Sequence, residues 1–245
     1  MTAAAPRWEI RIAAAGDLHV DPSVTGPWLR ALEPVSDEAD ALLLAGDLTQ
    51  LGVSTEAEAL AEALAPITIP IFAVLGNHDL HSNQGDRVRR ILERAQVCVL
   101  EGQSTTLMVS GHSVGIAGTI GFGGGFPGAE ASDFGEPELK QFVARSRRLA
   151  DSLEAALGEL DTDVRIALTH YAPVPETLHG ERREIYPFLG SHFLGSAIDA
   201  TGADLAIHGH AHLGSEEGKT PGGVVVRNVA QPVIRAPYRV FRFAA

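Results

Sequence analysis

Most of the side chains that could do chemistry in this 245-residue chain come directly after short apolar runs. The pattern recurs five times: 10–15 precedes Asp17 and His19, 41–45 precedes Asp47, 69–75 precedes Asn77 and His78, 164–168 precedes His170, and 204–207 precedes His208, His210 and His212. Carboxylates and imidazoles without a thiolate suit Zn²⁺, Mn²⁺ or iron rather than a soft metal. One ion would not need so many ligands, whereas two ions about 3.5 to 4 Å apart, bridged by one carboxylate, would use them.

The spacing of the first three polar groups predicts the elements that position them. Asp17, Asp47 and Asn77 follow one another at intervals of 30 residues, and such an interval is close to the length of a βαβ unit. The runs before them are almost continuously apolar, which is typical of parallel strands covered on both faces. Because the carboxyl ends of parallel strands lie at one edge of a sheet, we expect the three residues to emerge together.

The rest of the chain continues this α/β pattern. A helix is predicted from Pro137 to about residue 160, because apolar residues recur there at three- and four-residue steps. Two interpretations of the glycine-rich segment 121–128 stay open: a flexible surface connection, or a backbone-lined wall of an active site. We expect one layered domain over residues 1–245, with one sheet from each half of the chain and helices outside. Further helices are predicted at 54–65 and 86–95, and further strands at 96–100, 105–109, 113–118, 224–229 and 238–243.

The composition argues against several classes of function. The 31 acidic and 19 basic residues give a net charge of −12, which repels the backbone of long DNA or RNA. No run approaches the roughly 18 apolar residues of a membrane-spanning helix. Glu9 and Arg11 interrupt the N-terminal apolar stretch, so we predict no export signal and a cytoplasmic location. The single Cys98 excludes an intrachain disulfide and is predicted to be a small buried residue.

Five motifs, taken in order, resemble those of the calcineurin-like metallophosphoesterases. They span residues 16 to 212 and are Asp17-x-His19, Gly46-Asp47, Gly76-Asn77-His78-Asp79, Thr169-His170 and Gly209-His210-x-His212. An isolated Gly-Asp pair is weakly specific, but five such motifs in order at strand ends are hard to obtain by accident. The resemblance implies an α/β fold, a four-layer α/β/β/α sandwich of two mixed sheets, with a dinuclear metal site at the C-terminal ends of the strands.

The resemblance also implies a role for each matched residue. His78 matches the histidine that binds phosphate or protonates the leaving group, and the Asn77 amide would donate to the phosphate. The cofactors would be two divalent transition-metal ions, Mn²⁺, iron or Zn²⁺, with a bridging hydroxide as the nucleophile. The first ion would be held by Asp17, His19, Asp47 and His212, and the second by Asp47, Asn77, His170 and His210.

One position departs from the pattern of the phosphoprotein phosphatases in this superfamily. These enzymes have an aspartate three residues after the bridging aspartate, where it orients the catalytic histidine, and Gln50 stands there in this chain. A protein phosphatase is therefore disfavoured, and His78 lacks one source of a raised pKa. Asp79 has two interpretations, as a compensating carboxylate or as a helix-capping residue.

Some residues near the motifs also have two interpretations. We predict that His208 packs beside the ligands, or supports one of them, rather than binding metal. Arg182 and Arg183 would bind a second phosphate or a carboxylate of the substrate through forked donors, or face solvent beside acidic neighbours. The loops 120–135 and 171–190 are expected to discriminate between substrates.

The sequence therefore predicts a metal-dependent phosphohydrolase that cleaves a small phosphomonoester or phosphodiester. One alternative is a nuclease acting on short or single-stranded nucleic acid, although no basic stripe or aromatic platform supports it. The other is a non-catalytic interaction scaffold, which would tolerate lost ligands, whereas every motif position is filled here. The sequence makes no prediction of the oligomeric state.

Overall fold

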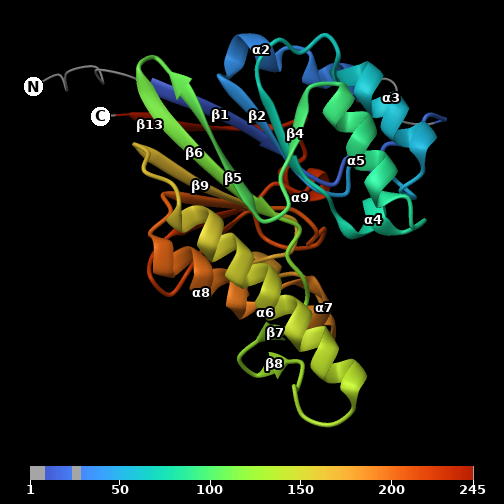
Figure 1. Cartoon of the computed structure of the whole chain (residues 1–245), viewed down its shortest axis with the longest axis vertical. Coiled ribbons are helices and arrows are strands. Elements are labelled where there is room, and N and C mark those ends of the chain that lie inside the picture. Colours follow the sequence, from blue (N-terminus) through green and yellow to red (C-terminus); the bar gives the residue numbers. More distant parts are fainter. Residues whose placement is uncertain (1–8, 24–28, 245) are drawn as a thin grey trace, which may run out of the picture.

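Two β-sheets stack face to face, and helices cover the outer face of each (Figure 1). The computed structural model describes residues 9–23 and 29–244. The predicted lack of an export signal concerns the N-terminal stretch, of which residues 1–8 lie outside this description. Within the described residues, no helix combines the length and the apolar character needed to cross a membrane.

The first sheet has five strands in the order β13-β1-β2-β3-β4. Strands β1 to β4 are parallel, and β13 pairs antiparallel with β1. Residues of α2, α3 and α5 pack on its outer face. The bounds are β1 Glu9–Ala15, α2 Val35–Glu38, β2 Ala41–Ala45, α3 Ser54–Leu64, β3 Ile71–Val74, α5 Gly85–Arg94, β4 Val97–Val99 and β13 Arg239–Ala244.

The second sheet has six strands in the order β11-β12-β10-β9-β6-β5. Its four central strands are parallel, and both edge strands are antiparallel to their neighbours. Helices α6 and α8 cover its outer face. The bounds are β5 Gln103–Val109, β6 His112–Thr119, α6 Pro137–Gly158, β9 Val164–Thr169, α8 His192–Thr201, β10 Leu205–His208, β11 Glu217–Lys219 and β12 Val225–Asn228.

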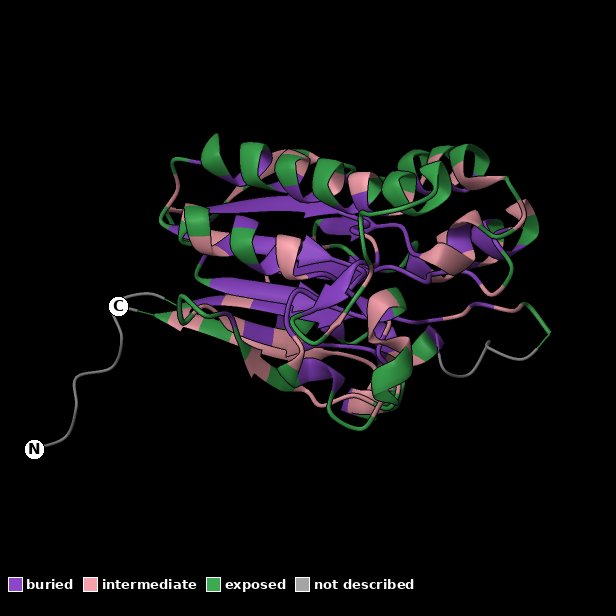
Figure 2. Ribbon diagram, turned by 90° about the horizontal axis from the view of Figure 1, so that it is seen from below, coloured by how far each residue is buried: buried purple, intermediate pink, exposed green. Residues whose placement is uncertain are grey.

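Strand β2 shows why the sheets stack. All five of its residues are buried, and their side chains alternate between the two faces of the sheet. Leu42 and Leu44 pack with the helices of the outer layer, whereas Leu43 packs with residues of the second sheet. Figure 2 shows that most of the strands are buried and that the helices are exposed on their outer surfaces. The predicted α/β/β/α sandwich with two mixed sheets is confirmed.

The prediction that each half of the chain forms one sheet is wrong. Strands β5 and β6 precede the midpoint of the chain but belong to the second sheet, and the C-terminal β13 returns to the first. Strand β13 pairs with β1 over six residues, so it covers an edge that would otherwise expose unpaired backbone groups. The short elements are η1 Arg30–Leu32, α4 Asn77–Leu80, β7 Gly125–Phe126, β8 Ala129–Glu130, η2 Glu176–Leu178, η3 Arg183–Ile185, α7 Tyr186–Leu189 and α9 Gln231–Ile234.

The glycine-rich segment 121–128 is mostly buried, so the prediction of a flexible surface connection is wrong. The backbone N–H of Gly124 donates to Pro187 O, and that of Gly125 donates to Gly190 O. These bonds need a close approach of two backbones, which glycine permits because it has no side chain. The segment therefore anchors residues 187–190 rather than linking two surface elements loosely.

Cys98 is exposed, so the prediction of a buried cysteine is also wrong. It lies on β4, an edge strand of the first sheet. Its neighbours Val97 and Val99 are buried, and the alternation of side chains along a strand turns Cys98 away from them.

We expect Leu43→Ala to lower the free energy of unfolding by about 2–5 kcal/mol, because it leaves a cavity between the sheets. Urea unfolding measures this loss. The control is Leu139→Ala on α6, where the leucine is 43% exposed and the change should stay within about 0.5 kcal/mol. Equal losses in the two variants would contradict the packing described for Leu43.

Candidate metal centre

The candidate ligands come together at the carboxyl ends of strands from both sheets. Ligand atoms form three groups, and within each group all of them lie within 4.8 Å of one another: Asp17, His19 and His212; His19, Asp47 and His78; and Asp47, His170 and His210. The remaining candidate, Asn77, places its Oδ1 2.9 Å from His170 Nε2. All seven residues predicted to bind metal therefore lie in one place.

Four of these residues have an unusual backbone conformation. Asp17, His19, Asp47 and His210 have positive φ angles of 59°, 44°, 48° and 70°, in the left-handed region that side chains other than glycine disfavour. Hydrogen bonds between the first two loops hold this conformation, because Asp17 N donates to Gly46 O and His19 N donates to Asp47 O, each at 2.9 Å. Backbone strain of this kind clusters at functional sites.

Two glycines allow the carboxylates to sit close to the backbone. A β-carbon at Gly76 would collide with the Asp47 carboxylate, and one at Gly209 would collide with the Asp17 carboxylate. Each carboxylate accepts hydrogen bonds from the backbone at this close approach: Asp47 Oδ1 from His78 N at 2.8 Å and Asp17 Oδ2 from His210 N at 2.9 Å. These bonds fix the direction of both side chains.

The first group consists of Asp17, His19 and His212. His212 Nε2 lies 2.8 Å from Asp17 Oδ1 and 3.4 Å from His19 Nε2. Burial lowers the pKa of His19, whereas the hydrogen bond to Asp17 raises the pKa of His212. His19 Nδ1 is buried without a hydrogen-bond partner among the described residues. Two facing ring nitrogens beside a carboxylate fit a shared cation.

The second group is centred on His170. Its Nδ1 donates to Ala45 O at 2.8 Å, which leaves Nε2 to face Asp47 Oδ1 at 3.3 Å. A carbonyl partner on one nitrogen commonly fixes a histidine so that the other nitrogen can bind metal. Similarly, His210 Nε2 donates to Phe188 O at 3.1 Å, which leaves Nδ1 for a ligand.

The charges of this second group favour a cation. Burial lowers the pKa of His170, but the neighbouring Asp47 carboxylate outweighs burial and raises it to about 9. Burial opposes ionisation of Asp47, yet His170 and the His78 N–H hold its pKa well below the usual range. Burial lowers the pKa of His210 to about 4. Asp47 is thus ionised and His210 neutral, as metal ligands must be, and a bound cation would displace the His170 proton.

His78 is oriented by a backbone group rather than by a carboxylate. His78 Nδ1 donates to the backbone carbonyl of Gln50 at 2.7 Å. The main chain at position 50 therefore orients the His78 ring, although the Gln50 side chain has no carboxylate to do so. Asp79 does not supply the missing carboxylate beside His78. Its buried carboxylate accepts hydrogen bonds from the backbone N–H groups of Gly76, Leu48 and Thr49, as expected of a helix-capping residue.

Two buried residues support the turn that carries His210 and His212. His208 donates from Nδ1 to Gly209 O and places Nε2 2.8 Å from Thr177 Oγ1, so it packs beneath the ligands, as predicted. Asn228 was not predicted, and its Nδ2 donates to Ala211 O at 2.8 Å. Nothing in its residue type or spacing distinguished it from an ordinary strand residue.

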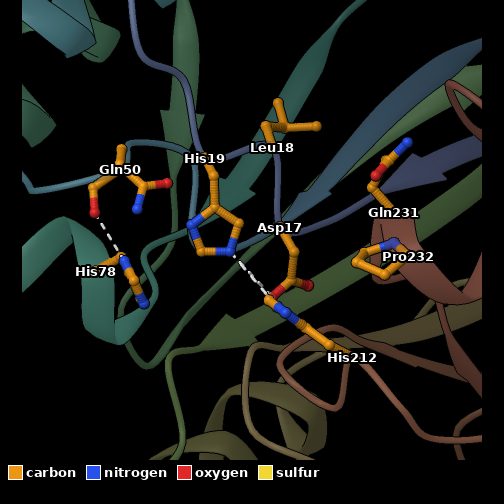
Figure 3. Close-up of a pocket in the computed structure, with 8 residues that line it drawn as sticks. All are labelled: Asp17, Leu18, His19, Gln50, His78, His212, Gln231 and Pro232. Atoms are coloured by element: carbon orange, nitrogen blue, oxygen red, sulfur yellow. Dashed lines mark hydrogen bonds and ion pairs between the residues drawn. The ribbon is translucent and has the colours of Figure 1, made fainter. Parts of the chain in front are cut away.

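A pocket of about 470 Å³ opens beside the first group (Figure 3). Gln231 and Pro232 of α9 were not predicted to line it. The bridge between Gly16 and Ala230 brings the start of α9 beside Asp17, and no sequence motif marks this contact. The lining residues are Asp17, Leu18, His19, Gln50, His78, His212, Gln231 and Pro232.

The structure does not bring Arg182 and Arg183 to this pocket. Both residues are exposed, and Arg183 donates to Gly128 O at 3.2 Å beside a separate hollow near the β7–β8 hairpin. Their predicted role in substrate binding therefore stays a prediction, and the fold supplies no support for it at the metal ligands.

The sequence profile of the calcineurin-like phosphoesterases matches residues 10–214, a range that contains every candidate ligand. The chain belongs to the calcineurin-like phosphoesterase family. Members of this family typically bind two metal ions, and the carboxylate and imidazole groups described above fit that requirement.

Part of the chain is similar to a phosphodiesterase. A probable cyclic nucleotide phosphodiesterase of Ruthia magnifica subsp. Calyptogena magnifica is 39% identical over 49 residues, which is 20% of this chain and 21% of that relative. The match thus spans about a fifth of the curated relative.

Two solved structures show the same fold at low sequence identity. The phosphopantetheinyl hydrolase of Mycobacterium tuberculosis has a TM-score of 0.71 and 16% identity, over 95% of this chain and 96% of that chain. GAP50, described as the anchor in the inner membrane complex of Plasmodium, has a TM-score of 0.59 and 15% identity, over 91% of this chain and 72% of that chain.

We expect Asp47→Ala to lose metal at both positions, because the Asp47 carboxylate belongs to two of the three groups. Elemental analysis of protein dialysed against Mn²⁺ measures the metal content per chain. Asp151→Ala, on the exposed side of α6, is the control and should retain the wild-type content. Wild-type metal content in Asp47→Ala would rule out the shared carboxylate.

Proposed function

We propose that this protein is a metal-dependent phosphohydrolase that cleaves a small phosphomonoester or phosphodiester. The observation that carries the proposal is the overlap of the three ligand groups: two of them share Asp47 and two share His19, and His78 of the middle group lines the pocket. Membership of the phosphoesterase family supports the same class of reaction. The proposed cofactors are two divalent ions chosen from Mn²⁺, iron and Zn²⁺, held by the seven candidate ligands.

The protein's residues would bind and orient the reacting groups. When bound, two divalent cations supply a water molecule with a pKa lowered toward about 7 and polarise the phosphoryl oxygens. The charge of two bound divalent cations would exceed the charges of Asp17 and Asp47, so the loaded site would attract an anion although the chain carries a net charge of −12. Asn77 offers a neutral Oδ1 to metal and its amide hydrogens to the phosphate.

His78 would act on the leaving group. Because its Nδ1 is bonded to Gln50 O, its Nε2 is the atom that remains for the substrate. From that nitrogen it would hold a proton for the departing ester oxygen or donate to a phosphoryl oxygen. The backbone contact keeps the ring in place while it does so.

The pocket favours a small substrate. Its volume of about 470 Å³ lies within the roughly 300–1,000 Å³ of small-molecule sites. The names of the relatives point to different esters, a cyclic nucleotide and a phosphopantetheinyl group, so the proposal stays with the reaction class. A nuclease is less favoured, because neither Lys nor Arg is among the lining residues of the described part of the chain.

The second candidate is a non-catalytic scaffold. GAP50 shares this fold and is described as an anchor. This likeness does not indicate what partner a scaffold built from this chain would bind. The complete set of candidate ligands argues against this candidate, because a scaffold would not need them.

We expect turnover of p-nitrophenyl phosphate or bis(p-nitrophenyl) phosphate with at least one of Mn²⁺, Fe²⁺, Zn²⁺ and Mg²⁺, and none with a chelator. An oligonucleotide assayed in parallel tests the nuclease. The same ions should raise the melting temperature, because they bind the folded chain. Absence of metal-dependent turnover together with an unchanged melting temperature would favour the scaffold.

We expect His78→Ala to retain wild-type metal content but to lose about 10²- to 10⁴-fold in kcat, the usual contribution of a proton-transfer residue. Elemental analysis and steady-state kinetics measure the two quantities. His81 is an exposed histidine at the C-terminal end of α4, and His81→Ala is the control for a general effect of removing an imidazole. Equal kcat values for His78→Ala and wild type would show that His78 takes no part in the reaction.

A further inference from the structure

Two glutamines, Gln50 and Gln231, line the pocket, and both are partly buried. Within the described part of the chain their hydrogen bonds are made by backbone groups alone. The N–H groups donate to Val20 O and Gly16 O, and the carbonyls accept from His78 Nδ1 and Arg235 N. Neither side-chain amide is among the buried polar groups without a partner, so both amides are accessible to a ligand in the pocket.

The two glutamines stand on different sides of the candidate metal ligands. Gln50 follows β2 and lies beside His78, whereas Gln231 begins α9 after β12. Figure 3 shows Asp17 and His19 between them. A substrate whose phosphoryl group sits at the metal ligands would therefore extend its organic group along one or both amides.

The rest of the lining favours a neutral organic group. Leu18 and Pro232 add apolar surface, and Asp17 is the one carboxylate among the lining residues. No Lys or Arg side chain is among them in the described part of the chain. A second phosphoryl group would thus find no Lys or Arg side chain among these described residues, while a ring or short chain would find both apolar contact and hydrogen-bonding groups.

We propose that Gln50 and Gln231 determine specificity by binding a neutral organic group with paired hydrogen-bond donors and acceptors, attached to a single phosphoryl group. The inference rests on the proposed function and names the substrate class of the same site. Nucleobases and amides both have this chemistry, because a glutamine amide pairs with an adjacent donor and acceptor. Esters that lack such groups gain nothing from the two amides.

The test compares kcat/KM for esters that differ in the organic group. AMP and cyclic AMP represent a base, 4′-phosphopantetheine represents a linear amide, and the two p-nitrophenyl esters lack paired donors and acceptors. The variants are Gln50→Met and Gln231→Met, which keep the length of the side chain and remove its amide. Gln141→Met is the matched control, because Gln141 is exposed on α6.

We expect wild type to prefer at least one adenosine or pantetheine ester over the p-nitrophenyl ester of the same class. The ratio of the two kcat/KM values should fall roughly tenfold to hundredfold in each pocket variant and should not change in the control. ADP should be a poorer substrate than AMP if the preferred ester is a nucleotide. A preference for the adenosine ester identifies a base as the ligand, and a preference for phosphopantetheine identifies an amide.

The failures of the two proposals are distinguishable. Metal-dependent hydrolysis with the same ratio in wild type and both pocket variants overturns this inference and leaves the proposed function intact. Wild type that prefers the p-nitrophenyl esters overturns it as well. No hydrolysis of any ester with any of the four metals overturns both.

Discussion

The arrangement of the site depends on the Asp47 carboxylate, which must belong to two ligand groups at once. One of its oxygens faces His170 Nε2 at 3.3 Å, and the other lies 3.9 Å from His19 Nε2. Such a position requires a left-handed backbone at Asp47 and no side chain at Gly76. A shared Asp47 carboxylate therefore depends on a strained backbone at Asp47 and on a glycine at position 76. Such strain costs free energy of folding and is typical of functional sites.

The sandwich provides the remaining constraint. Asp17, Asp47 and Asn77 follow strands of the first sheet, and the candidate ligands His170, His210 and His212 follow β9 and β10 of the second. His208 is the last residue of β10 and packs rather than binding metal. Several hydrogen bonds cross between the sheets at this edge. In two of them, His170 Nδ1 donates to Ala45 O and His210 N donates to Asp17. Packing between the sheets, as at Leu43, thereby sets the distances between ligands that are more than a hundred residues apart in the sequence.

The sequence was sufficient to predict the features that repeat. Buried parallel strands must be apolar on both faces, so β1, β2 and β3 were recognisable, and the polar groups after them marked the candidate ligands. It did not predict β11, because this edge strand has the polar sequence Glu-Gly-Lys. Nor did it predict which sheet each strand joins, since the return of β13 to β1 depends on tertiary pairing.

Contacts made by the main chain could not be predicted from the sequence either. The orientation of His78 depends on the carbonyl of Gln50, an atom that every residue has, so the residue type at position 50 gave no signal of it. Gln231 reaches the pocket through the bridge between Gly16 and Ala230, and the buried role of segment 121–128 depends on residues 187–190. Each of these features became visible only when distant segments were placed side by side.

This edge of the sandwich is proposed to hold two cations that share Asp47. Anomalous X-ray diffraction from crystals of the wild-type protein grown with Mn²⁺ would locate each cation. We expect two anomalous peaks, one on each side of the Asp47 carboxylate, with His212 nearest one peak and His170 nearest the other. A single peak, or peaks that do not touch Asp47, would contradict it.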